Sequence, residues 1–138
     1  MPGGLYLLMR ILVADGSEMI RRGIKGLLSS ETTWEVCGEA TDGAEVLWKA
    51  RQLLPDLILL DISMPGLSGF EAARRLRQEV PKAKILVMSQ HDPIQLLPRA
   101  VEAGAHACLD KSLLGTDLLS AIKSIEGISE ACRPAGAG

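Results

Sequence analysis

The sequence predicts one α/β domain, a doubly wound five-stranded parallel sheet built from five βα units, (βα)5. Three observations predict it: short apolar runs alternate five times with helical patterns, several of these runs are apolar throughout, and no linker divides the chain. Strands that alternate with helices of about 10–15 residues are typical of a parallel sheet with helices on both faces. At 138 residues the chain is long enough to bury a core.

The strands are predicted from apolar or alternating runs. ILVA, LILL and ILVM are continuous and suit the buried centre of the sheet, whereas WEVCGEA alternates as a half-buried strand does. The predicted strands are 10–15, 34–40, 56–61, 83–89 and 106–111.

The helices are predicted from apolar residues at helical spacing and from their end signals. Ser17 is a plausible N-cap, Pro55 closes the second helix, Pro93 stands near the first position of the fourth, and Pro98 is expected to bend it. The predicted helices are 17–30, 42–54, 68–80, 92–104 and 113–127. Residues 1–9 are expected to form an N-terminal extension, 10–127 the domain, and 128–138 a disordered tail.

Composition excludes several classes of function. The net charge is −2 and aromatic residues make up 3% of the chain, so neither a basic nucleic-acid face nor a base-stacking platform is expected. Three cysteines without a CxxC pair argue against a disulfide framework and a zinc site, and for a reducing, cytoplasmic setting. No apolar run approaches the roughly 20 residues that span a bilayer, so no membrane association is expected.

Polar residues follow four of the predicted strands where they end: Asp15, Asp61, Ser89 and Lys111. Ligands of open α/β sheets bind outside the carboxyl ends of the strands, so these side chains are expected to converge. Carboxylates suit Mg²⁺, an Asp beside such an ion can become an aspartyl phosphate, and Lys and hydroxyl groups stabilise phosphoryl oxygens. Each residue alone would be interpreted as a cap, a turn or a surface group. Their joint placement favours a phosphoryl-transfer pocket.

These motifs resemble those of the receiver domain of bacterial two-component response regulators, with the CheY-like (flavodoxin-like) fold. The resemblance covers about residues 10–127, and its motifs are LLDISMPGLSGFEAARRLR, ILVMSQHD and AGAHACLDKS. DISMPGLSG and DKSLLGTDLLSAI are most similar to receivers attached to LuxR/NarL-type helix-turn-helix domains.

The resemblance implies a role for each strand-end residue. Asp61 matches the phosphoacceptor, Ser89 the hydroxyl that turns toward the phosphoryl group, and Lys111 the lysine that pairs with it. Asp15 matches the first position of the acidic pair that, with Asp61 and the main-chain carbonyl of Ser63, would bind Mg²⁺.

Two positions depart from the family pattern. The second acid of the pair, which usually contacts the metal directly, is replaced by Gly16, so weakened Mg²⁺ affinity is expected. Glu18 is a candidate to replace it, although an acid in the first turn of a helix also suits the macrodipole. Cys108 occupies the position of the aromatic residue that rotates on activation, so switching would depend on Ser89 and the segment after it.

The sequence leaves competing functions open. The first is a phosphorylation-operated switch that accepts a phosphoryl group from a histidine kinase or phosphotransfer protein, at most assists its own phosphorylation and dephosphorylation, and dimerises through the helix four to helix five face. The second is a phosphorylation-independent pseudo-receiver that binds a protein partner. A haloacid-dehalogenase-type phosphatase is disfavoured because Ser63 stands where the general acid would be. The chain itself is not expected to bind DNA, and transcription regulation would belong to a linked domain.

Overall fold

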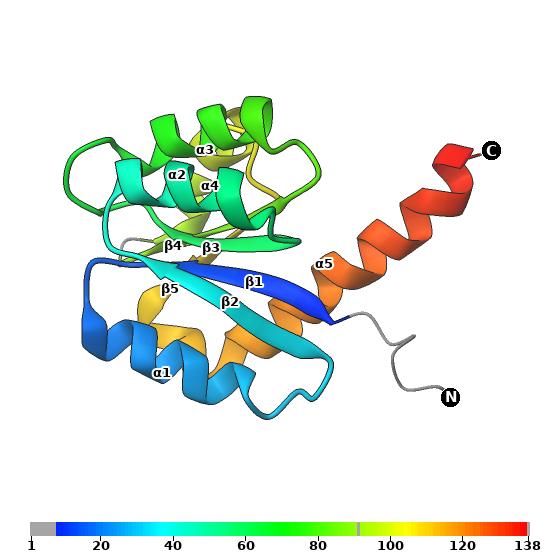
Figure 1. The fold of residues 1–138 in the computed structure, drawn as a ribbon, viewed down its shortest axis with the longest axis horizontal. Coiled ribbons are helices and arrows are strands. Elements are labelled where there is room, and N and C mark those ends of the chain that lie inside the picture. The colour runs from blue at the N-terminus through cyan, green and yellow to red at the C-terminus, as the bar shows by residue number, and fades with distance from the viewer. Residues whose placement is uncertain (1–7, 91, 138) are drawn as a thin grey trace.

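Five parallel strands form one sheet in the order β2-β1-β3-β4-β5, as shown in Figure 1. This computed structural model describes residues 8–90 and 92–137, with the backbone alone for residues 127–137. The strands are β1 (Met9–Ala14), β2 (Trp34–Ala40), β3 (Leu57–Asp61), β4 (Lys84–Ser89) and β5 (Ala107–Asp110). The helices are α1 (Glu18–Leu28), α2 (Gly43–Leu53), α3 (Gly69–Glu79), α4 (Pro93–Glu102), the 3₁₀ helix η2 (Lys111–Leu113) and α5 (Leu114–Ala137).

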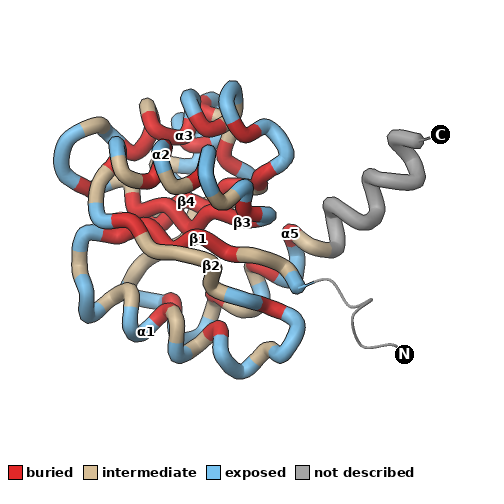
Figure 2. Tube along the Cα trace, in the orientation of Figure 1, coloured by how far each residue is buried: buried red, intermediate tan, exposed pale blue. Residues whose placement is uncertain are grey.

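Helices cover both faces of the sheet, which confirms the predicted doubly wound (βα)5 fold (Figure 1). One apolar cluster packs α2, α3 and α4 on one face, and a second packs α1 and α5 on the other. Neighbours along a strand face opposite sides, so Leu60 joins the first cluster and Leu59 the second. Both faces of β3 are therefore buried, and the red core of Figure 2 runs through it.

The helices begin at the polar residues that the sequence indicates. The Ser17 hydroxyl accepts a hydrogen bond from the Ile20 amide at 3.2 Å, and Ser68 accepts one from the Glu71 amide at 3.2 Å. Such caps satisfy amide groups that have no partner inside the helix. Pro93 is at the start of α4, and Pro98 lies inside that helix.

Most boundaries shift by one or two residues from those predicted, and three differences need an explanation. Strand β1 begins at Met9, inside the predicted extension, whose residues 1–7 lie outside the described part of the chain. Lys111 opens the 3₁₀ helix instead of ending β5, because Asp110 caps this turn by accepting from the Ser112 amide at 2.8 Å. The backbone of α5 is helical as far as Ala137, unlike the disordered tail predicted from residue 128. Residues 128–133 contain no Gly or Pro that would end the helix, and it continues through Pro134 and Gly136. Residue 138 lies outside the described part.

None of the helices in the described residues is sufficiently long and apolar to cross a membrane.

His106 joins the start of β5 to β4 through a pair of hydrogen bonds. Its amide donates to the Ile85 carbonyl at 2.7 Å, and its Nδ1 accepts from the Ile85 amide at 3.1 Å. Burial, followed by the charges of Lys84 and Arg77, lowers the pKa of His106 below its ordinary value of 6.5. The folded state thus binds fewer protons than the unfolded state, and stability should fall as the pH drops below 6.5.

We expect urea unfolding at pH 7.5 and 5.5 to show this loss in the wild type and a smaller one in His106→Asn. The Asn amide oxygen can replace Nδ1 as an acceptor but does not titrate. An equal loss in both proteins would contradict the role of His106.

Candidate functional site

Two buried carboxylates lie where β1 and β3 end. Asp15 directly follows β1 and is 1% exposed, and Asp61 is the last residue of β3 and is 3% exposed. The strand order reverses between these neighbouring strands, since the chain passes from β1 to β2 on one side and later returns to β3 on the other. Such a switch point is where open α/β sheets bind ligands.

Lys111 contacts both carboxylates. Its ammonium lies 2.8 Å from Asp15 Oδ2 and 3.2 Å from Asp61 Oδ2, and its side chain is 7% exposed. Burial by itself would lower the pKa of Lys111, but its contact with Asp15 and the charges of Asp61 and Asp15 outweigh burial and raise that pKa above the ordinary 10.5. Lys111 is therefore charged at neutral pH, and the structure brings these three predicted residues together.

Asp15 is fixed from several sides. Its amide donates to the Ala40 carbonyl at 3.0 Å, and its Oδ1 accepts from the Ser17 amide at 2.8 Å. Its Oδ2 is buried and lies 2.8 Å from the Lys111 ammonium, the charged donor that balances it. An inward-facing oxygen of this kind is suited to a cation.

Asp61 is held by the turn that follows it. Its Oδ1 accepts hydrogen bonds from the amide of Ser63 at 3.0 Å and from the Ser63 hydroxyl at 2.8 Å. These contacts of the Ser63 amide and hydroxyl were not predicted, although Ser two residues after Asp is typical of such a turn. The turn is tightened by Gly66, at φ +81°, and by Gly69, where a Cβ would stand 2.2 Å from the Cα of Ile62.

Ser89 and Cys108 occupy different surroundings. Ser89 ends β4 beside β3 and is 1% exposed, and it lies one residue beyond Met88, the register partner of Asp61. Cys108 is half-buried in β5, opposite Val87, and packs against the cluster beneath α2, α3 and α4. Burial raises the pKa of Cys108, so it is a neutral thiol at pH 7.

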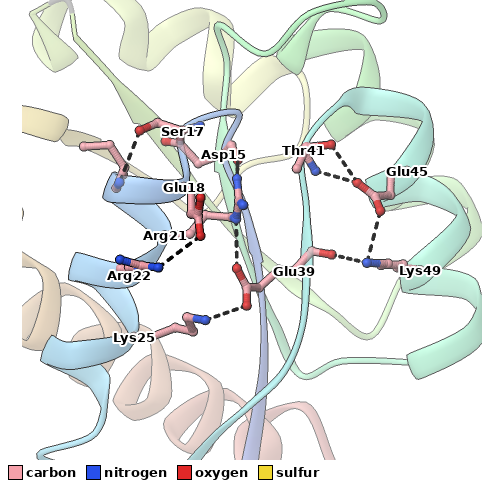
Figure 3. Close-up of polar contacts among 11 residues, drawn as sticks. Asp15, Ser17, Glu18, Arg21, Arg22, Lys25, Glu39, Thr41, Glu45 and Lys49 are labelled. Carbon is pink, nitrogen blue, oxygen red and sulfur yellow. Dashed lines mark hydrogen bonds and ion pairs between the residues drawn. The ribbon is translucent and has the colours of Figure 1, made fainter.

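Gly16 leaves open the place of a second acid. A Cβ there would meet the Thr41 carbonyl at 3.6 Å and Pro65 Cδ at 3.7 Å, both ordinary contacts. Glu18 does not fill this place, because its carboxylate pairs with Arg22 at 3.3 Å on the exposed side of α1. Figure 3 shows both Glu18 and Arg22 on this helix.

A second charged cluster supports the Asp15 side of the site and was missed by sequence analysis. Arg21 lies between Asp15 and Glu39, and Lys25 reaches the same glutamate (Figure 3). The contacts with Lys25 and Arg21 lower the pKa of Glu39 below its ordinary 4.5. The sequence contains a signal for this cluster. Glu39 stands near the end of the strand that pairs with β1, and its negative charge is opposite to the positive charges that Arg21 and Lys25 contribute to α1.

The donor set fits Mg²⁺. Two carboxylates and one main-chain carbonyl, those of Asp15, Asp61 and Ser63, are oxygen ligands of the kind that Mg²⁺ binds while keeping several waters. Among the described residues, no three His, Cys, Asp or Glu side chains are grouped closely enough to hold a metal by themselves. Mg²⁺ bound by this donor set would keep water in its other coordination positions.

The fold and the strand-end carboxylates together define a CheY-like α/β signalling domain. Residues 11–123 match the family described as the response regulator receiver domain, and the chain therefore belongs to this family. This finding confirms the resemblance seen in the sequence, and the domain is the receiver domain of a two-component response regulator.

Two curated relatives are bacterial regulatory proteins. The transcriptional regulatory protein YxjL of Bacillus subtilis is 34% identical over 116 residues, which are 84% of this chain and 53% of YxjL. The response regulator protein VraR of Staphylococcus aureus is 33% identical over 115 residues, which are 83% of this chain and 55% of VraR. The chain thus spans about half the length of these relatives.

Solved structures of response regulators also superpose on this chain. A LuxR-family two-component response regulator from Aurantimonas sp. SI85-9A1 superposes with a TM-score of 0.80 at 32% identity, covering 86% of this chain and 84% of that one. The signal receiver domain of NarL from Mycobacterium tuberculosis has the same TM-score and identity, covering 86% of this chain and 96% of that one.

Proposed function

We propose that this domain is a phosphorylation-operated switch in which Asp61 accepts a phosphoryl group from a histidine kinase or phosphotransfer protein. The observation that supports it best is the Lys111 ammonium, which contacts the buried carboxylates of both Asp15 and Asp61. A lysine in this position can pair with the transferred phosphoryl group once Asp61 is modified.

In the proposed reaction, an Asp61 oxygen attacks phosphorus, and the bond from phosphorus to the donor's imidazole nitrogen breaks with its electron pair returning to the imidazole. Lys111 and the Ser89 hydroxyl stabilise the phosphoryl oxygens. Asp15, Asp61 and the Ser63 carbonyl would hold Mg²⁺, which when bound neutralises charge on the phosphoryl group. The domain at most assists its own phosphorylation and dephosphorylation. Because Gly16 contributes no carboxylate, the Mg²⁺ affinity is weakened.

The output is proposed to be transcription regulation by a linked domain, in a cytoplasmic protein. The name of the relative YxjL, a transcriptional regulatory protein of which the chain spans about half, supports this proposal. Phosphorylation would promote a homodimer through the face from α4 to α5. On that face α4 exposes three apolar side chains, Ile94, Leu97 and Val101, at helical spacing.

A second candidate is a pseudo-receiver that binds its partner without phosphorylation. Two residues favour it: Gly16, which removes one metal-binding acid, and Cys108, which cannot act as a rotating aromatic ring. The buried Asp61 and its contact with Lys111 favour the switch.

Intact-protein mass after treatment with acetyl phosphate and Mg²⁺ separates the two. We expect the wild type to gain the mass of one phosphoryl group and Asp61→Asn to gain none. Chromatography with light scattering on the same samples reports whether the phosphorylated form dimerises. No added mass, even with excess Mg²⁺ and a cognate kinase, would favour the pseudo-receiver.

A further inference from the structure

The Arg21 guanidinium belongs to α1 and lies next to the main chain of Asp15, where β1 ends. Its side chain is 13% exposed although it belongs to a surface helix. One nitrogen, Nη1, donates to the main-chain carbonyl of Asp15 at 2.8 Å, and Nε donates to Glu39 Oε1 at 2.8 Å. Arg21 thus joins α1 to the ends of β1 and β2.

Glu39 is itself fixed, so it can hold Arg21 in place. Its second oxygen accepts from the Lys25 ammonium at 2.6 Å, and its main-chain carbonyl accepts from Lys49 (Figure 3). Glu39 is the register partner of Val13, whose side chain packs with α1 and α5. The glutamate therefore has strand, helix and charge contacts that keep the guanidinium aimed at Asp15.

Arg21 fixes the main-chain carbonyl of Asp15, in addition to the hydrogen bonds that fix its amide and its carboxylate. Gly16 follows directly, and glycine restricts the backbone less than any other residue. Asp15 is also the one acid of the usual pair that remains, so an error in its position is not compensated by a second carboxylate.

We propose that Arg21 is a positioning residue for divalent-cation binding, which holds Asp15 through its main-chain carbonyl and is itself held by Glu39. This inference rests on the proposed function, because the cation is the one that phosphorylation of Asp61 uses. Arg21 contacts neither the cation nor the phosphoryl group and acts through Asp15.

Arg21→Ala and Arg22→Ala form a matched pair for the test. Arg22 is the next residue of α1 and pairs only with exposed Glu18 among the described residues, at 3.3 Å. Mg²⁺ titration followed by amide chemical shifts should show about tenfold weaker binding in Arg21→Ala and no change in Arg22→Ala. In the metal-free protein, hydrogen exchange at the Ser17 amide, which bonds Asp15 Oδ1, should be about tenfold faster in Arg21→Ala alone. Arg21→Lys should restore part of the affinity because its ammonium can reach one of the two acceptors.

Equal Mg²⁺ affinity in the two alanine variants would overturn the proposal. A uniform increase of exchange through β3 would also overturn it, since Arg21 would then support the whole fold and not Asp15 in particular. If Arg21→Ala does not fold, Glu39→Gln serves instead and should weaken Mg²⁺ binding in the same direction; unchanged affinity in that variant would overturn the proposal. Failure of the proposed function is distinguishable, because both readouts are made without phosphorylation and would change even if the wild type gains no phosphoryl mass.

Discussion

Replacing Lys111 by methionine lowers the free energy of unfolding at pH 7 by about 3–5 kcal/mol, the usual cost of removing one partner from a buried ion pair. The ammonium serves two carboxylates that are 1% and 3% exposed, those of Asp15 and Asp61. Without it these two charges repel each other in a site that water hardly reaches. Methionine fills much of the volume of the lysine stem, so the loss reports charge more than packing.

The pH range of this effect follows from the raised pKa of Lys111. The stabilisation by a lysine with a raised pKa is complete below its ordinary value of 10.5 and is lost only as the pH rises through the higher pKa of the folded state. Urea unfolding at neutral pH therefore measures the whole effect.

Lys123→Met is the matched control, because Lys123 pairs with Glu31 at 3.2 Å with its side chain 55% exposed. A pair exposed to this extent contributes about 0–1 kcal/mol. Two additions should recover stability in Lys111→Met: a second change, Asp61→Asn, which removes one of the two charges, and Mg²⁺, which binds the folded state. Equal losses in Lys111→Met and Lys123→Met would show that the charge of Lys111 does not stabilise the folded strand ends.

The architecture could be predicted from the sequence because the signals that mark its strands and helices are local. Ser17 and Ser68 cap helices where hydroxyl residues precede helical patterns, and the second strand has the predicted bounds, Trp34–Ala40. The convergence of Asp15, Asp61 and Lys111 also follows from the sequence, because parallel strands end at one edge of a sheet. Their burial and the 2.8 Å and 3.2 Å contacts of Lys111 required the structure.

What the sequence did not predict depends on side-chain direction. Arg21 and Arg22 are adjacent arginines on one helix, yet Arg21 points to Asp15 and Arg22 to Glu18. No local pattern separates them, because the difference arises from where α1 lies over β1 and β2. The same geometry sends the Glu18 carboxylate away from Gly16, so this acid does not replace the missing one. Cys108 is only half-buried because β5 is at the edge of the sheet.

Restoring the missing acid with Gly16→Asp should tighten Mg²⁺ binding by about tenfold or more, which corresponds to about 1.4 kcal/mol. The backbone permits this change, since Gly16 is not among the positive-φ glycines and its Cβ would lie 3.6 Å or more from its neighbours. The new carboxylate would stand at an exposed position and add a full negative charge next to the buried carboxylate of Asp15.

The added charge is expected to change the free energy of unfolding in opposite directions without and with Mg²⁺. Without Mg²⁺, Gly16→Asp adds a third carboxylate to a site with one ammonium and should lower the free energy of unfolding; with Mg²⁺ the loss should be reversed. Gly16→Asn is the matched control, because it has the same shape but no charge. Calorimetric Mg²⁺ titration and urea unfolding, with and without the metal, give both quantities. If the Asp and Asn variants bind Mg²⁺ alike, the missing carboxylate does not limit metal binding, and the proposal that Gly16 weakens the affinity is wrong.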